Sequence, residues 1–292
     1  MRISLIDVDS KIPNLALMKI SSYHKSKGDT VGLNLKNPDK IYQSIVFRKN
    51  KAKALNKTLS DISVEFGGSG INNKRLPDKI EYLKPDYDLY PSEYSQGFTT
   101  RGCNRNCYFC GVVNKEGTFK RWQHPDEFYC EQFDQVKLMD NNILYDKMWT
   151  QEILNYFIDK GVDVDMTQGY DLRLIDEDVI DIICRSTKGM IRLAFDDSKL
   201  ESVVREKIQL FKDYSFDVRN KLQFYCYCHD DSMHDDTLNR CKILKNLGTN
   251  AFVMFNCDQP RTSRIRNLIR WCNRKAIYWS IPYEKYNRKS YS

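Results

Sequence analysis

The stretch Cys103-Asn-Arg-Asn-Cys107-Tyr-Phe-Cys110 holds three cysteines within eight residues, in the spacing C-x3-C-x2-C. Three closely spaced thiolates suit a cubane iron–sulfur cluster in which one iron has no protein ligand. Such an iron can bind a small molecule, whereas a fully ligated cluster mainly carries electrons. The spacing therefore predicts a cluster that takes part in chemistry, and the rest of the chain is interpreted around the loop that holds it.

With this motif the chain resembles the radical S-adenosylmethionine (SAM) superfamily, in which an aromatic residue precedes the third cysteine, as Phe109 does here. The Thr-Arg-Gly lead-in before Cys103 is similar to that family as well. The resemblance implies that Cys103, Cys107 and Cys110 each ligate one iron of a [4Fe-4S] cluster and that SAM chelates the fourth. An electron from the cluster would cleave SAM to a 5′-deoxyadenosyl radical, which would take hydrogen from a substrate. An external electron donor of the flavodoxin or ferredoxin type would reduce the cluster.

A zinc site is the alternative interpretation of the same cysteines. Structural zinc needs four ligands in a closed tetrahedron, and the nearest candidates for the fourth are His124 and Cys130. Neither stands at a usual zinc-finger spacing. The competing function is a non-enzymatic nucleic-acid-binding protein with a structural zinc or iron–sulfur site.

Residues 1–92 predict a small Rossmann-like domain and a linker. Strand patterns cover residues 2–8, 30–35, 43–47 and 62–66, and a helix pattern follows Pro13-Asn14. Short strands with helical connections indicate a parallel sheet. This part resembles the cobalamin-binding-type domain of some radical SAM proteins, but the Asp-x-His-x-x-Gly motif is absent and His24 is its only histidine. We therefore expect a degenerate domain used for substrate binding or scaffolding, in which the glycines at 67–70 cradle a phosphate or form a tight turn.

Residues 93–292 predict an α/β fold, a partial (β/α)6 TIM-like barrel. Strand patterns recur with helical segments between them, and each ends in polar residues; they cover residues 97–102, 136–139, 162–166, 190–195, 222–228, 251–256 and 276–281. The active site of a β/α barrel lies at the carboxyl ends of its strands. These polar residues would therefore face the cysteine loop.

The resemblance also indicates which strand ends hold SAM. The family often uses a Gly-Gly-Glu segment for the amino group, which this chain lacks; Asp140 or Asn141 stands at the equivalent place. Other polar groups would bind the ribose hydroxyls and the carboxylate, and Phe109 would contact the adenine. These polar groups are Gln168, Asp171 and Arg173 after the third strand and Asp196 after the fourth. Arginine suits a carboxylate because it donates two parallel hydrogen bonds.

The composition fits a globular protein, with 41% hydrophobic and 12% aromatic residues in 292. No run of apolar residues is long enough to span a membrane, and the amino terminus is not typical of a signal peptide. We therefore expect no membrane partner and a cytoplasmic location, where cysteines stay reduced. A strand would place Cys226 and Cys228 on one face, which allows a second metal site.

The carboxyl-terminal segment from Arg261 is rich in basic residues, with aromatic residues between them. Arg266, Arg270 and Arg274 repeat at every fourth residue and form a stripe on one helical face. Basic and aromatic side chains together can bind phosphates and stack on bases. The segment thus predicts either a solvated helix face or contact with an RNA or another phosphate-bearing substrate.

Overall fold

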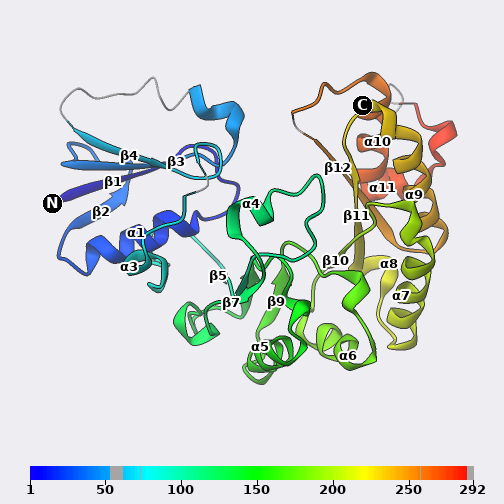
Figure 1. Cartoon of the computed structure of the whole chain (residues 1–292), viewed down its shortest axis with the longest axis horizontal. Coiled ribbons are helices and arrows are strands. Elements are labelled where there is room, and N and C mark those ends of the chain that lie inside the picture. Colours follow the sequence, from blue (N-terminus) through cyan, green and yellow to red (C-terminus); the bar gives the residue numbers. More distant parts are fainter. Residues whose placement is uncertain (53–61, 73, 257, 288–292) are drawn as a thin grey trace. The chain divides into compact units, whose positions relative to one another are not determined.

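The computed structural model describes residues 1–52, 62–72, 74–256 and 258–287 (Figure 1). The chain forms two compact units, each described by itself. Unit 1 contains residues 1–106 and 111–137, and unit 2 contains residues 107–110 and 138–292. The boundary that the sequence suggested, after residue 92, lies inside unit 1.

The first part of unit 1 is a four-stranded parallel sheet in the order β2-β1-β3-β4. Its strands are β1 (Arg2–Asp7), β2 (Thr30–Leu33), β3 (Lys40–Ser44) and β4 (Ser63–Gly67). Helices α1 (Leu15–Lys25) and α3 (Asp78–Glu81) lie on one face of the sheet in Figure 1. The Asn14 side chain caps α1 by accepting from Leu17 N at 3.2 Å, and Ile3, Leu5, Leu17, Ile20 and Ile80 form the core beneath. The predicted parallel α/β sheet is confirmed, although β3 begins three residues before the predicted strand at 43–47.

The glycine-rich segment after β4 is a tight turn. Gly68 has a φ of +95°, and a Cβ there would stand 2.3 Å from Ile45 O. Gly70 N donates to that same oxygen at 2.9 Å. Glycine is thus required because the backbone turns against Ile45, which favours the turn over the phosphate cradle.

The second part of unit 1 carries the chain into and out of the cysteine loop. It contains β5 (Ser95–Gly97), β6 (Thr100–Arg101), α4 (Val112–Glu116) and β7 (Lys120–Arg121). β6 and β7 pair antiparallel, so one strand leads into the loop and the other leads out. The strand predicted over 97–102 is divided in two at Phe98 and Thr99: β5 lies in a sheet beside the next predicted strand, β8 (Gln135–Leu138), whereas β6 pairs with the returning chain. The short strand β8 lies at the border between the units.

Unit 2 is built on parallel strands with helical connections. Strands β10 (Ile191–Ala194), β11 (Leu222–Cys228) and β12 (Asn250–Phe255) form a parallel sheet in that order. The fourth strand is β9 (Asp163–Met166). The helices are α5 (Lys147–Asp159), α6 (Glu177–Ser186), α7 (Glu201–Asp213), α8 (Val218–Lys221), α9 (His234–Asn246), α10 (Ser263–Asn273) and α11 (Lys275–Ser280).

No closed barrel forms among the strands that the structure describes. The last predicted barrel strand, over 276–281, is wrong, because this segment is helix α11. Its residues favour strands, but Tyr278 is buried against Trp271 of α10, with ring centroids 5.1 Å apart. Packing between two consecutive helices therefore overrides the local preference.

None of the helices in the described part of the chain combines the length and the apolar character needed to cross a membrane.

Candidate functional site

The three cysteines of the motif lie in one loop, and none of them forms a disulfide bond. Cys103 and Cys107 are partly exposed and Cys110 is exposed. The border between the units passes through this loop, since Cys103 belongs to unit 1 and Cys107 and Cys110 belong to unit 2. Arg105 N donates to Cys103 Sγ at 3.4 Å, and hydrogen bonds of this kind tune the potential of iron–sulfur clusters.

The donor set fits an iron–sulfur cluster in its chemistry. Three accessible, unbridged thiols are the ligands that iron–sulfur clusters use. Within the described residues, however, no three His, Cys, Asp or Glu side chains are gathered closely enough to hold a metal ion. The loop therefore supplies the right groups, and binding would have to draw the thiols together.

The two candidates for a fourth zinc ligand are in different situations. His124 Nδ1 lies 2.9 Å from Asp126 Oδ2, whereas Cys130 is a partly exposed cysteine whose backbone nitrogen donates to Ser95 Oγ at 2.9 Å. A closed tetrahedral zinc site is therefore not assembled by the described residues.

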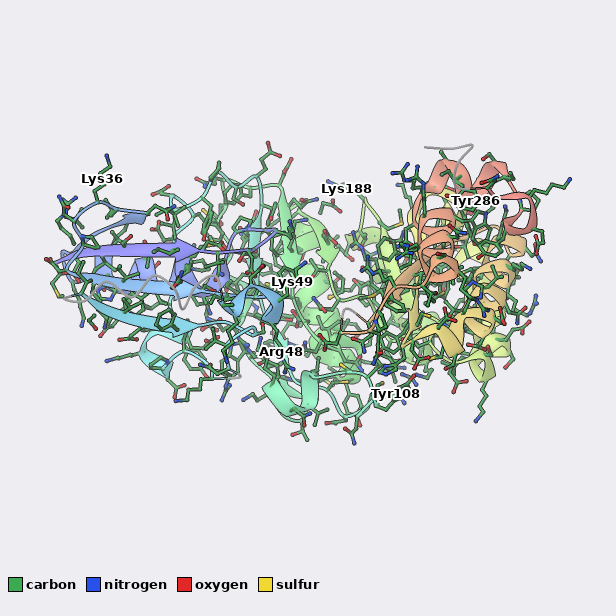
Figure 2. All side chains as sticks on the ribbon, turned by 90° about the horizontal axis from the view of Figure 1, so that it is seen from above. Lys36, Arg48, Lys49, Tyr108, Lys188 and Tyr286 are labelled. Carbon is green, nitrogen blue, oxygen red and sulfur yellow. The ribbon has the colours of Figure 1, made fainter. Side chains whose placement is uncertain are left out.

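Phe109 ties the second half of the motif to the sheet of unit 2. Its ring stacks on Tyr227, with centroids 4.2 Å apart and planes at 19°. Tyr108 meets Tyr227 edge-on at 6.3 Å and is 75% exposed, and Figure 2 labels its side chain at the surface. Since Tyr227 is the second-last residue of β11, the motif residues 107–110 lie at the carboxyl end of a parallel strand, where sites of such sheets are found.

Tyr227 also begins a row of polar contacts across two strand ends. Its hydroxyl lies 3.0 Å from His229 Nδ1, and Asn256, which follows β12, places Nδ2 3.5 Å from the same nitrogen. Burial raises the pKa of Tyr227, so its hydroxyl stays protonated near neutral pH. The sequence analysis missed Tyr227 as a site residue; its signal was the alternation Tyr225-Cys226-Tyr227-Cys228, which puts both tyrosines on the face opposite the buried cysteines.

Asp196 lies at the end of β10 and contacts the same strand end. Its Oδ1 accepts from Tyr227 N at 2.7 Å. Burial raises the pKa of the Asp196 carboxyl, against the lowering effects of that hydrogen bond and of Arg240. Asp196 and Phe109 thus each contact Tyr227, Asp196 at its backbone nitrogen and Phe109 at its ring.

Arg240 of α9 fixes the ends of β10 and β11. Its guanidinium is fully buried and donates to Phe195 O at 2.5 Å and to Tyr227 O at 2.9 Å. It also donates to Thr237 Oγ1 and to Asp236, both on its own helix. A buried cation that satisfies strand carbonyls holds the backbone on which Asp196 and Tyr227 stand.

The remaining predicted SAM-binding residues form a second group in unit 2. Asp171 and Arg173 make a bidentate ion pair, with Nε–Oδ1 2.7 Å and Nη2–Oδ2 3.1 Å. Asn142 Nδ2 lies 3.4 Å from Asp171 Oδ2 and connects the pair to the segment of Asp140, which is fully buried. Asp171 also caps the short helix η4 (Leu172–Leu174). The fork of Arg173 is therefore already occupied, and a SAM carboxylate would have to compete with Asp171.

Two other predicted residues of this region, Asn141 and Gln168, differ in how far they are exposed to solvent. Asn141 is partly buried beside Asp140, and Gln168 is exposed in the turn after β9. Gly169 has a φ of +81° and a Cβ there would stand 2.8 Å from Arg192 O, which explains the turn. The structure thus brings Asn142, Asp171 and Arg173 together and leaves Gln168 at the surface.

Four further cysteines in the described part of unit 2 face the core. Cys226 and Cys228 lie on one face of β11, as predicted, and both are buried. Cys241 and Cys272 are also buried, with their sulfurs 3.6 Å apart, and the pKa values of the Cys226 and Cys241 thiols are raised. No metal-binding group is found there among the residues described, so the second metal site is not supported.

The basic carboxyl-terminal segment is mostly folded into unit 2. Ile265, Leu268 and Cys272 of α10 are buried, which confirms the predicted apolar face. Trp271 and Tyr278 are buried too, so these aromatic rings cannot stack on bases. The residues from 288 onward lie outside the described part.

Comparison with known proteins adds no family to these observations. No protein-family profile matches the chain, and no curated protein sequence matches it. One solved structure, a mutant XylFII–LytSN complex, covers 94% of this chain and 89% of that chain at 11% identity. Its TM-score of 0.19 is too low to carry an argument about fold or function.

Proposed function

We propose that this protein is a radical SAM enzyme. The observation that carries the proposal is the motif Cys103-x3-Cys107-x2-Cys110, whose Phe109 lies at the carboxyl end of β11. Parallel strands with polar groups at one end, where Asp196, His229 and Asn256 stand, support it. We also propose that the strands of unit 2 are those of an open, partial barrel; Tyr170 N donates to Arg192 O and so links the end of β9 to β10.

Each group of predicted residues would bind a different part of the two cofactors. Cys103, Cys107 and Cys110 would hold the [4Fe-4S] cluster and leave one iron for SAM. When bound, these cofactors would supply a 5′-deoxyadenosyl radical for hydrogen abstraction. Phe109, braced by Tyr227, would orient the adenine, and Asp196 would accept from the ribose hydroxyls. The cofactor performs the bond breaking, while the protein positions it and limits access of water.

The other predicted groups act at the amino-acid end of SAM. Asp140 or Asn141 would accept from the ammonium, and Gln168, Asp171 and Arg173 would bind the ribose hydroxyls or the carboxylate. The exposed thiol of Cys110 supports access by an external electron donor of the flavodoxin or ferredoxin type. The substrate is proposed only as a class, an RNA or another phosphate-bearing molecule, on the strength of the basic residues from Arg261 onward.

The test is an anaerobic reconstitution with iron and sulfide, followed by reduction, addition of SAM and measurement of 5′-deoxyadenosine. We expect the product from the wild type and from Cys184→Ala, since Cys184 lies on α6 outside the motif. We expect none from Cys107→Ala. Stoichiometric zinc without iron in the isolated protein, together with no deoxyadenosine, would refute the proposal and favour the non-enzymatic nucleic-acid-binding alternative.

A further inference from the structure

A buried network of four charged side chains lies in unit 1, at the base of the cysteine loop. Lys19, Glu81, Arg101 and Glu116 are 2%, 5%, 6% and 9% exposed. Arg101 Nη1 donates to Glu116 Oε2 at 2.9 Å, and Nη2 donates to Glu81 Oε1. Lys19 Nζ lies 3.7 Å from the same Glu81 oxygen and donates to Gln123 Oε1 at 3.1 Å. Two cations and two anions therefore neutralise one another away from water.

Arg101 and Glu116 of this network lie on either side of the cysteine motif in the chain. Arg101 stands two residues before Cys103, and Glu116 ends the helix that follows the motif. Their ion pair thus joins the incoming and outgoing arms of the loop. Cys103 N donates to Gly117 O at 3.2 Å, and Phe119 N donates to Asn104 Oδ1 at 3.0 Å. The same closure is made by one backbone hydrogen bond and one bond to the Asn104 side chain.

The other two members of the network come from the Rossmann-like part. Glu81 ends α3, and Lys19 is in the middle of α1, which packs on the parallel sheet. Both are connected to Arg101 through the Glu81 carboxylate. Arg101 is also stacked on Phe98, with its guanidinium carbon 3.9 Å from the ring centroid. A planar guanidinium can bridge two carboxylates and stack on a ring at once, which lysine cannot do.

We infer that Arg101 is a positioning residue for the cysteine loop, and that α1 and α3 serve this loop by supplying Lys19 and Glu81. The inference rests on the proposed function for what the loop binds. Breaking a buried ion pair leaves an uncompensated charge, so the arrangement has one favoured geometry. Partners that hydrogen-bond a metal ligand typically change metal affinity about 10–100-fold when removed. The side chain of Arg101 contacts Glu81, Glu116 and Phe98, so its effect would pass through the backbone of Gly102 and Cys103 and should lie at the lower end of that range.

The first experiment uses the full-length, metal-free protein and does not depend on activity. Alkylation by iodoacetamide is followed by mass spectrometry at Cys103 and at Cys130, a partly exposed thiol of the same unit that serves as the internal reference. We expect Arg101→Met to raise the ratio of the Cys103 rate to the Cys130 rate several-fold. Arg101→Lys, which keeps the charge but not the bridge, should give a smaller rise.

Two further variants separate positioning from stability. Leu5→Ala removes a fully buried side chain from the sheet core, and should lower the melting temperature while leaving the ratio unchanged. Glu116→Gln keeps the shape of the side chain and breaks the charge pair that joins the loop arms. If Arg101→Met does not fold, the alkylation ratio of Glu116→Gln tests the inference instead, and we expect that ratio to rise. An unchanged ratio in the folded variant would overturn the inference, as would an equal rise in Leu5→Ala.

The second readout is retention of iron by the reconstituted protein against a chelator. We expect Arg101→Met to lose iron about 10-fold faster or more at equal chelator concentration, whereas Leu5→Ala should behave as wild type. If the wild type takes up no iron at all, the proposed enzyme function fails. The alkylation ratio still tests the positioning role in that case, so the two failures are distinguishable.

Discussion

Replacement of Arg240 by methionine tests whether one buried cation holds the strand ends of the candidate site. The side chain would keep much of its apolar volume but lose the hydrogen bonds to Phe195 O and Tyr227 O. An unsatisfied buried carbonyl costs about 1–3 kcal/mol. Asp236 is 44% exposed, so the loss of that ion pair adds only about 0–1 kcal/mol. Together we expect a loss of roughly 3 kcal/mol in the free energy of unfolding.

Such a loss corresponds to a fall in melting temperature of about 6–12 °C for a unit of this size. Thermal unfolding followed by circular dichroism measures it directly. The matched control is Arg205→Met, which removes an exposed i,i+4 pair with Glu201 on α7 and should change stability by about 0.5 kcal/mol or less. If Arg240→Met and Arg205→Met lower the melting temperature equally, the argument that Arg240 satisfies buried strand carbonyls is wrong.

Two other substitutions probe the site and the loop. Asp196→Asn keeps an oxygen that can accept from Tyr227 N. The pKa of Asp196 is raised in the folded protein above its ordinary 3.8, so the folded state binds the proton more tightly than the unfolded state does. The resulting stabilisation of the wild type is present at low pH and is lost as the pH rises from 3.8 through the raised pKa. The variant should therefore gain stability over wild type as the pH rises above about 4 in urea titrations, and a pH-independent difference would contradict the assignment. Gly102→Ala places a Cβ 2.1 Å from Thr118 O at a φ of +78°, so we expect a lower melting temperature and faster alkylation of Cys103. Gly111→Ala, where the added Cβ meets nothing within 4 Å, is the control, and equal behaviour of the two would argue against the close approach.

The sequence was sufficient to locate most strands of unit 2. Strand β11 begins and ends where the apolar pattern over 222–228 predicted, because a continuous run flanked by polar residues leaves little choice of register. The strand prediction for residues 276–281 was wrong because the local pattern there does not distinguish a strand from a helix. The aromatic and branched residues of this segment suit a strand as well as a helix, and only the contact of Tyr278 with Trp271 decides between them.

The site shows a similar division. The three cysteines stand close together in the chain, so their spacing alone indicates a metal ligand set. The stack of Phe109 on Tyr227 joins residues far apart in sequence, and no local pattern encodes it. Arg240 lies on a helix of mostly polar residues and is typical of a solvated side chain until the fold places it under two strand ends. Prediction from sequence therefore reaches the candidate ligands but not the residues that surround them.

Two groups of cysteines among the described residues differ in their exposure. Those of the motif are partly or fully exposed, while Cys226, Cys241 and Cys272 are enclosed by β11, α9 and α10. Burial raises the pKa of Cys226, and the contact with Cys272 together with burial raises the pKa of Cys241, so both thiols stay protonated. Iron and sulfide react with thiolates that they can reach. Chemical assembly of a cluster would consequently be directed to the loop without competition from the enclosed sulfurs. The number of reactive thiols in the native protein, compared with the number in denaturant, would therefore report the folding of unit 2.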